Sequence, residues 1–166
     1  MGEVPAADPF LPLLDAHAKF GEKLTELETA LDEMVTSRAV SDVNVAILDQ
    51  ALRFFREDLL PHFRLEDEVV LPPLEARIGR FGTLVNVIAY EHEEVRREIE
   101  KFQEARAVLG LQDDAWPAIE ELNRHGIFAI QFLWDHFRKE KVSLFPTARE
   151  QLAPEELARI RDRLRA

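Results

Sequence analysis

The stretch His62-Phe63-Arg64-Leu65-Glu66 occurs a second time in the chain, as His136-Phe137-Arg138-Lys139-Glu140. Each copy places a histidine four residues before a glutamate and leads into an apolar run that ends in a proline. The two histidines are 74 residues apart (136 − 62), and a second pair, His17 and His92, is 75 residues apart (92 − 17). We therefore predict two copies of one structural unit, related by a pseudo-twofold axis.

Apolar residues recur at three- and four-residue spacing in four long segments, a pattern typical of amphipathic helices. These segments span about residues 13–31, 43–70, 84–102 and 119–137. No Asn-Gly turn and no sustained alternation of apolar and polar residues indicates a strand pair. Each structural unit is thus predicted to be a helical hairpin, and the fold class all-α, an antiparallel up-down four-helix bundle.

Prolines are expected to interrupt two of these helices. Pro61 lies inside the second helix and should kink it, because proline removes one backbone donor. Pro72 and Pro73 are expected to mark the end of the same helix or a second bend. The fourth helix should weaken near Pro146.

The remaining boundaries are predicted from capping residues and composition. Ser41 or Asp42 is expected to cap the second helix. A short extra C-terminal helix is predicted at about residues 154–165, where the first turn is acidic. We expect residues 1–166 to form a single domain with the bundle at about residues 10–146.

The composition excludes several classes of protein. The chain has 166 residues, with 21 Lys plus Arg against 32 Asp plus Glu, a formal charge of −11, and no cysteine. Iron–sulfur clusters, disulfides and Cys-ligated zinc are thereby excluded, so any metal is held by nitrogen and oxygen. The negative charge disfavours nucleic acid and anionic lipid as partners. The acidic N-terminus resembles no secretory signal, and the most apolar stretch, residues 127–134, is far shorter than the roughly 20 residues that span a bilayer. We expect a cytoplasmic protein, and the pattern neither implies nor excludes a dimer.

Helical geometry places the histidines and glutamates together. Residues four apart share a helix face, so His62 lies beside Glu66, and His136 beside Glu140, on the apolar faces of their helices. The three-and-four spacing places His17 and His92 on apolar faces as well, so four imidazoles and two carboxylates are predicted to point into one core. Because an unpaired buried carboxylate is costly, the pair requires cations, and two bridged divalent metals would supply them.

This arrangement resembles the hemerythrin-like family, the HHE cation-binding domains. His17, His62-x-x-x-Glu66, His92 and His136-x-x-x-Glu140 match the family pattern in order, over nearly all of the chain up to about Pro146. The resemblance implies a non-haem centre of two iron ions in a four-helix bundle, bridged by Glu66 and Glu140. It further implies that His17 and His62 hold one iron, and that His92 and His136 hold the other.

The chain departs from the oxygen-carrying hemerythrins in two places. Those carriers have a second histidine four residues after the histidine of the third helix, where this chain has Arg96. They also have a five-residue step from His to Asp on the last helix, where this chain has His136 and Glu140. Two histidines per iron leave positions for water, oxygen or a further carboxylate. The candidates for that carboxylate are Glu91, Glu93 and Glu94.

The roles of several nearby residues can be interpreted in two ways. His125 lies about 16 Å along the helix from His136, out of ligand range, and is interpreted as a capping or core histidine. Arg96 is interpreted as a solvated or snorkelling arginine, with a supporting role at the site as the alternative. Four acids either orient imidazole N–H groups or lie on the surface. They are Asp15, Asp58, Glu91 and Asp135.

Two other metal motifs do not fit. His92-Glu93-Glu94-Val95-Arg96 begins like the zincin motif but lacks its second histidine. Ferritin-type bundles use Glu-x-x-His, and no histidine here has an acid three residues before it.

Three functional hypotheses follow. The first is a di-iron protein that binds O2 or a related small molecule, a diatomic or a peroxide, or that senses iron and oxygen. The second is a di-iron enzyme, with ferroxidase, peroxidase or nitric-oxide-processing activity at the same centre. The third is a metal-free interaction bundle. Mixed imidazole and carboxylate ligands favour iron, with zinc or another divalent metal as a substitute.

Overall fold

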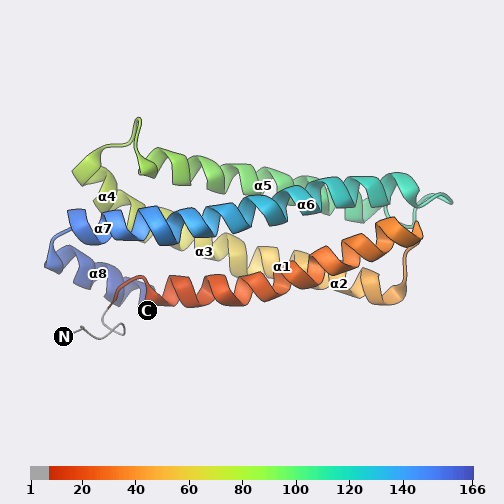
Figure 1. The fold of residues 1–166 in the computed structure, drawn as a ribbon, viewed down its shortest axis with the longest axis horizontal. Helices are drawn as coiled ribbons and strands as arrows, with labels where there is room; N and C mark the ends of the chain where they lie inside the picture. The colour runs from red at the N-terminus through yellow and green to blue at the C-terminus, as the bar shows by residue number, and fades with distance from the viewer. Residues whose placement is uncertain (1–7) are drawn as a thin grey trace.

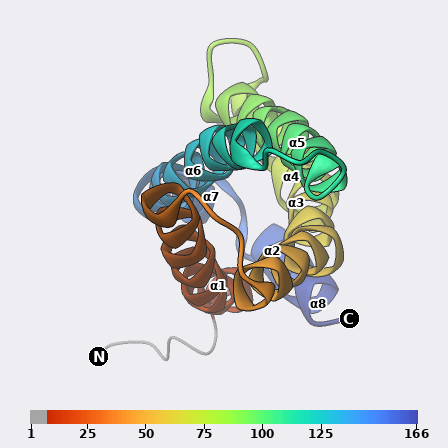
Figure 2. The same ribbon diagram turned by 90° about the vertical axis from the view of Figure 1, so that its right-hand side faces the viewer.

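The computed structural model describes residues 8–166, and within this range it contains helices but no strand. The predicted all-α bundle is confirmed: four long helical columns lie side by side and antiparallel (Figure 1), and they enclose a common core when seen from the end (Figure 2). The N-terminal stretch that resembles no secretory signal comprises residues 1–8. All of it except Asp8 lies outside the described residues.

The first column is α1 (Leu11–Ser37) and the third is α5 (Leu84–Val108). The second and fourth columns are composite, because π-helical turns, labelled η, join their α-helical segments. The second consists of α2 (Asp42–Phe54), η2 (Phe55–Leu59), α3 (Leu60–Leu65), η3 (Glu66–Val70) and α4 (Leu71–Ile78). The fourth consists of α6 (Trp116–Lys139), η4 (Glu140–Leu144) and α7 (Phe145–Gln151). The predicted extra C-terminal helix is α8 (Pro154–Arg165), which packs against η3.

Each π-helical turn ends two residues before a proline. In η3 the N–H of Leu71 donates to the carbonyl of Glu66, five residues earlier, and Pro72 follows. In η4 the N–H of Phe145 donates to the carbonyl of Glu140, and a proline again follows. A proline has no N–H, and its ring clashes with the carbonyl four residues earlier, so a wider turn lets the helix continue.

The prolines therefore interrupt the helices less than the sequence suggests. At Pro61 the structure has the π-helical turn η2, in which Leu60 donates to the carbonyl of Phe55. The second column does not end at Pro72 and Pro73 but continues to Ile78. The fourth likewise continues past Pro146, to Gln151.

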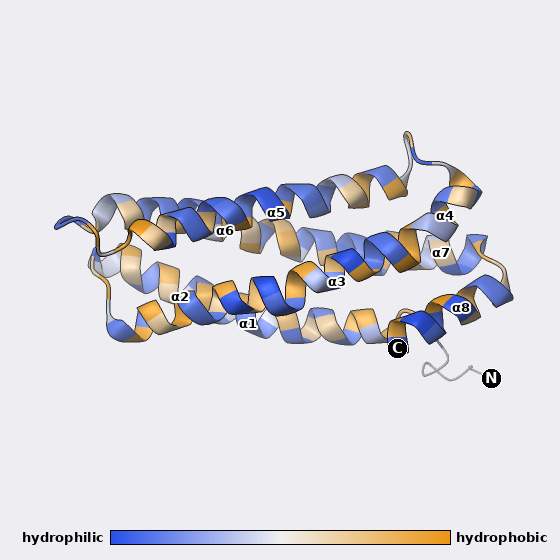
Figure 3. Ribbon diagram, turned by 180° about the vertical axis from the view of Figure 1, so that it is seen from behind, coloured by the Kyte–Doolittle hydropathy of each residue, from blue (hydrophilic) through white to orange (hydrophobic). Residues whose placement is uncertain are grey.

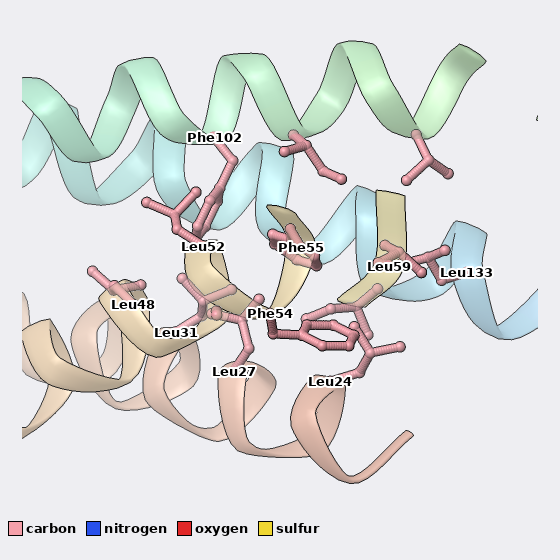
Figure 4. Close-up of a cluster of buried hydrophobic side chains, with 14 of the residues drawn as sticks. Leu24, Leu27, Leu31, Leu48, Leu52, Phe54, Phe55, Leu59, Phe102 and Leu133 are labelled. Atoms are coloured by element: carbon pink, nitrogen blue, oxygen red, sulfur yellow. The ribbon is translucent and has the colours of Figure 1, made fainter. Parts of the chain in front are cut away.

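The apolar core has two parts. The larger cluster fills the end of the bundle near the α1–α2 and α5–α6 connections, and Figure 4 shows Leu24, Phe55 and Phe102 pointing into it from three different columns. The smaller cluster fills the other end and includes Phe10 and Phe145. Polar and apolar residues alternate along each helix (Figure 3), as expected for helices with one buried face.

Two further expectations can be compared with the helices. Of the two predicted caps for the second column, the structure selects Ser41, whose hydroxyl accepts a hydrogen bond from the N–H of Asn44 at 3.1 Å. Within residues 8–166, no helix is long and apolar enough to cross a bilayer.

Candidate metal centre

Six buried polar residues meet between the two apolar clusters. The structure brings together all of the residues that the sequence singled out as ligands, and each has at most 8% of its surface exposed. α1 carries His17, α3 carries His62, α5 carries His92 and α6 carries His136, while Glu66 and Glu140 are the first residues of η3 and η4. On each helix the apolar residues on the two sides of these positions belong to different clusters.

One group of ligand atoms surrounds what we call the His17 position. His17 Nε2 lies 3.1 Å from His62 Nε2 and 3.1 Å from Glu140 Oε1. His62 Nε2 lies 3.2 Å from Glu66 Oε2. Each of these four residues offers a ligand atom within 4.8 Å of the others.

A second group surrounds what we call the His92 position. His92 Nε2 lies 3.1 Å from Glu66 Oε1, and His136 Nε2 lies 3.2 Å from Glu140 Oε2. These four residues also offer ligand atoms within 4.8 Å of one another. Both glutamates therefore belong to both groups, and each carboxylate turns one oxygen toward each position.

The distances repeat under the predicted twofold. His17 to Glu140 and His92 to Glu66 are both 3.1 Å, while His17 to Glu66 and His92 to Glu140 are 3.9 and 3.8 Å. The rings agree as well. Phe137 stacks on His17 at a centroid distance of 4.3 Å, and Phe63 stacks on His92 at 4.1 Å. The phenylalanine of each His-Phe-Arg motif thus covers a histidine of the other hairpin.

Most of the atoms that point into this centre lack hydrogen-bond partners, the exception being the contact between Nε2 of His17 and Nε2 of His62. Among the residues described, six of these buried atoms have none: both oxygens of Glu66, both oxygens of Glu140, and Nε2 of His92 and His136. A buried carboxylate oxygen without a donor costs free energy. Two divalent cations would satisfy all six atoms, so the donor set fits a pair of metal ions coordinated by nitrogen and oxygen.

The pKa values of the buried groups also indicate that the centre favours added positive charge. Burial and the negative charge of Glu66 raise the pKa of Glu140 well above its ordinary value. Burial lowers the pKa of His17 from 6.5 to about 3. Burial opposes the charge on His92, yet contacts with three carboxylates, Asp67 foremost, raise its pKa to about 10. Without metal, protons therefore supply part of the charge that cations would bring.

Two further carboxylates lie behind the His92 position. The Nδ1–H of His92 donates to Asp67 Oδ1 at 2.7 Å, and Asp67 in turn accepts from Arg96 at 3.0 Å. These contacts hold the ring with Nε2 toward the centre. Arg96 thus has the supporting role that the sequence offered as the alternative.

A matching chain of contacts holds the other ring. The Nδ1–H of His136 donates to Glu91 Oε1 at 2.8 Å, and Lys139 donates to the second oxygen of Glu91. Glu91 on α5 therefore contacts His136 on the neighbouring helix α6, and not His92, which is the next residue in the sequence.

The other three acids proposed to orient imidazoles do not do so. Asp15 and Asp58 are exposed, and Asp135 is 66% exposed and faces Lys139. Sequence reasoning missed Asp67, which is 25 residues from His92 in the chain. Its one local signal is that it directly follows Glu66.

The remaining expectations need correction. Glu93 and Glu94 are no ligands in this arrangement, because each pairs with an arginine of its own helix. His125 neither caps a helix nor lies in the core. It is partly buried between α5 and α6, with Nδ1 2.6 Å from Glu98 and Nε2 3.1 Å from Glu121.

A pocket of about 480 Å³ reaches the centre from the α1 and α6 side. Its lining is mostly apolar, with one imidazole and two cations: Leu14, His17, Ala18, Trp134, Phe137, Arg138 and Lys141. His17 is thus the ligand that this pocket exposes.

Comparison with known protein families identifies the family of the chain. The model of the hemerythrin HHE cation-binding domain matches residues 10–162. No curated protein matches the chain.

Proposed function

Because this chain belongs to the hemerythrin HHE cation-binding family, we propose that it holds two iron ions at the centre of the bundle. The ligands are the six buried residues of the candidate metal centre: His17, His62, Glu66, His92, His136 and Glu140. Glu66 and Glu140 bridge the two ions. One observation carries this proposal: each bridging carboxylate turns one oxygen toward each group of histidines.

The ligand chemistry favours iron. Two imidazole nitrogens and two carboxylate oxygens at each position are typical of redox-active iron sites, and they leave room for further ligands. The absence of cysteine removes the softer ligand that structural zinc sites commonly use. Zinc or another divalent metal is a substitute that the same donors accept.

We propose that the protein binds O2 or a related small molecule, a diatomic or a peroxide, at this centre. Bound iron supplies electrons to such a ligand. The chain supplies the surroundings: Phe63 and Phe137 cover two of the imidazoles and exclude water, while the pocket beside His17 admits a small ligand.

The test is elemental analysis of protein purified without air, followed by optical spectra as air is admitted. We expect iron in the wild-type protein and a charge-transfer band that appears in air and fades under vacuum. His62→Ala and Glu66→Ala should lose metal, while Asp58→Ala, an exposed acid near His62, should retain it. An iron-loaded protein that stays colourless in air would contradict oxygen binding. A wild-type protein without bound metal, even after incubation with Fe(II), would contradict the centre itself.

The second candidate is an enzyme that uses the same centre as a ferroxidase, a peroxidase or a nitric-oxide-processing protein. Open coordination positions motivate it, because two histidines and two shared carboxylates leave room for a substrate at each ion, and the pocket beside His17 gives a small substrate a path to the centre. Turnover of Fe(II), peroxide or nitric oxide faster than free iron achieves would support this function. Rates equal to those of free iron would exclude it.

A further inference from the structure

The two metal positions have equivalent ligands but different surroundings. Behind the His92 position, Asp67 and Glu91 accept hydrogen bonds from both imidazoles. Behind the His17 position, no Asp or Glu of the described chain lies within ion-pair distance of Nδ1 of His17 or His62. The twofold that holds for the ligands therefore ends at the next layer of residues.

The sequence shows how the symmetry is lost. The 74-residue offset places Lys141 at the position that corresponds to Asp67. The 75-residue offset places Ala16 at the position that corresponds to Glu91. The His17 position thus has a cation and a methyl group where the His92 position has two carboxylates, one from each hairpin.

This difference acts directly on the ligand nitrogens. A carboxylate that accepts from Nδ1–H makes Nε2 a stronger donor to a metal and fixes the orientation of the ring. At the His92 position, Arg96 and Lys139 hold the two carboxylates in place. On the side of the His17 position, the pocket is lined by two cations, Arg138 and Lys141, whose charge opposes the approach of a second cation.

Access from solvent also differs between the two positions. His92 and His136 are fully buried, whereas His17 is 8% exposed and lines the pocket. A metal at the His17 position can exchange with solvent through that pocket. A metal at the His92 position lies behind it.

From these observations we infer that the two positions bind metal in a fixed order. The His92 position fills first and holds its ion more tightly, and the His17 position fills second and releases its ion first. This inference rests on the proposed two-metal centre and adds that Asp67 and Glu91 are the residues that make its two halves unequal.

The first experiment is a titration of metal-free protein with Zn(II) in competition with a chromophoric chelator. Wild-type protein should bind two ions in separate steps. Asp67→Asn and Glu91→Gln should each weaken the first step by about 10- to 100-fold. The control is Asp58→Asn, which removes an exposed charge one turn before His62 and should leave both steps unchanged. Far-UV circular dichroism confirms that the variants fold.

The second experiment locates the first ion, because repulsion between two cations also separates two binding steps. One equivalent of Co(II) is added, and paramagnetically shifted imidazole N–H signals are recorded by NMR. We expect signals from the two histidines of the His92 position alone, one of them moved by Asp67→Asn. Signals from all four imidazoles would overturn the inference.

A gain of affinity provides the complementary test. Lys141→Asp places a carboxylate where the twofold puts Asp67 in the other hairpin, and it should tighten the second Zn(II) step. Equal loss of both steps in Asp67→Asn, or no loss at all, would also overturn the inference. A wild-type protein that binds neither Zn(II) nor Co(II) would instead overturn the proposed function.

Discussion

The two helical hairpins, α1 to α4 and α5 to α7, match closely at the centre and differ just outside it. Corresponding distances between imidazoles and bridging carboxylates agree within 0.1 Å, for example 3.9 Å for His17 to Glu66 and 3.8 Å for His92 to Glu140. Yet Asp67 accepts from Nδ1–H of His92, whereas no carboxylate among residues 8–166 contacts Nδ1 of His17. The helical register therefore places the six buried histidines and glutamates alike in both hairpins, while packing between helices makes their surroundings differ.

The largest expected effect tests the part that is symmetric. Glu66→Gln and Glu140→Gln should each weaken both metal positions by more than ~100-fold, the upper range for losing only a supporting hydrogen bond. The reason is that each carboxylate serves both positions. Elemental analysis of the purified variants measures the loss, with Glu68→Gln, an exposed neighbour, as the control. A variant that loses one metal and keeps the other would show that the carboxylates do not bridge.

Removal of metal should cost stability in the wild-type protein. At a free metal concentration about 1,000 times the dissociation constant, binding contributes about 4 kcal/mol. For a chain of this size, that corresponds to a fall in Tm of roughly 10 °C. The measurement is thermal unfolding with and without a chelator. Glu66→Gln serves as the control, since a chelator should not change its Tm.

In the metal-free protein, the pKa values of the equivalent histidines His17 and His92 should be shifted in opposite directions. The pKa of His17 is lowered to about 3, so the unfolded chain takes up a proton first and stability falls as the pH drops from 6.5 towards 3. The pKa of His92 is raised to about 10, so its contribution is complete below pH 6.5 and is lost as the pH rises towards 10.

NMR titration of the imidazoles, together with chemical unfolding at several pH values, measures both effects. Asp67→Asn should lower the pKa of His92 and leave that of His17 in place, because Asp67 contacts His92 alone of the two. Parallel titration of the two histidines would show that their surroundings are equivalent after all.

The smallest expected effect lies far from the centre. Ser41→Ala removes the hydroxyl that caps α2 and should cost about 1 kcal/mol in the free energy of unfolding. Chemical denaturation measures this loss. The metal content and the order of metal binding should stay as in the wild type, which separates general destabilisation from effects on the metal positions.

Much of the fold and the candidate site was predictable because it depends on local geometry. A spacing of four residues on a helix places His62 beside Glu66, whatever the rest of the chain does. The two copies of this motif, with two lone histidines at nearly equal offsets, then predict a bundle that brings six residues together. The effect of the prolines was harder to predict. The missing N–H of a proline can be accommodated either by a π-helical turn or by the end of a helix. The packing of α4 against α7 decides which of the two forms.

Periodicity and spacing are properties of neighbouring residues, and they were enough to predict the helices, the twofold pattern and the donor set. They could not predict which acids support the imidazoles. Asp67 contacts His92 across 25 residues of sequence, and Glu91 contacts His136 across 45. Acids next to histidines in the chain, such as Asp135, point outward instead. Which side chains meet across helices depends on how the helices pack, and that packing gives His92 and His136 the carboxylate contacts that His17 and His62 lack among the residues described.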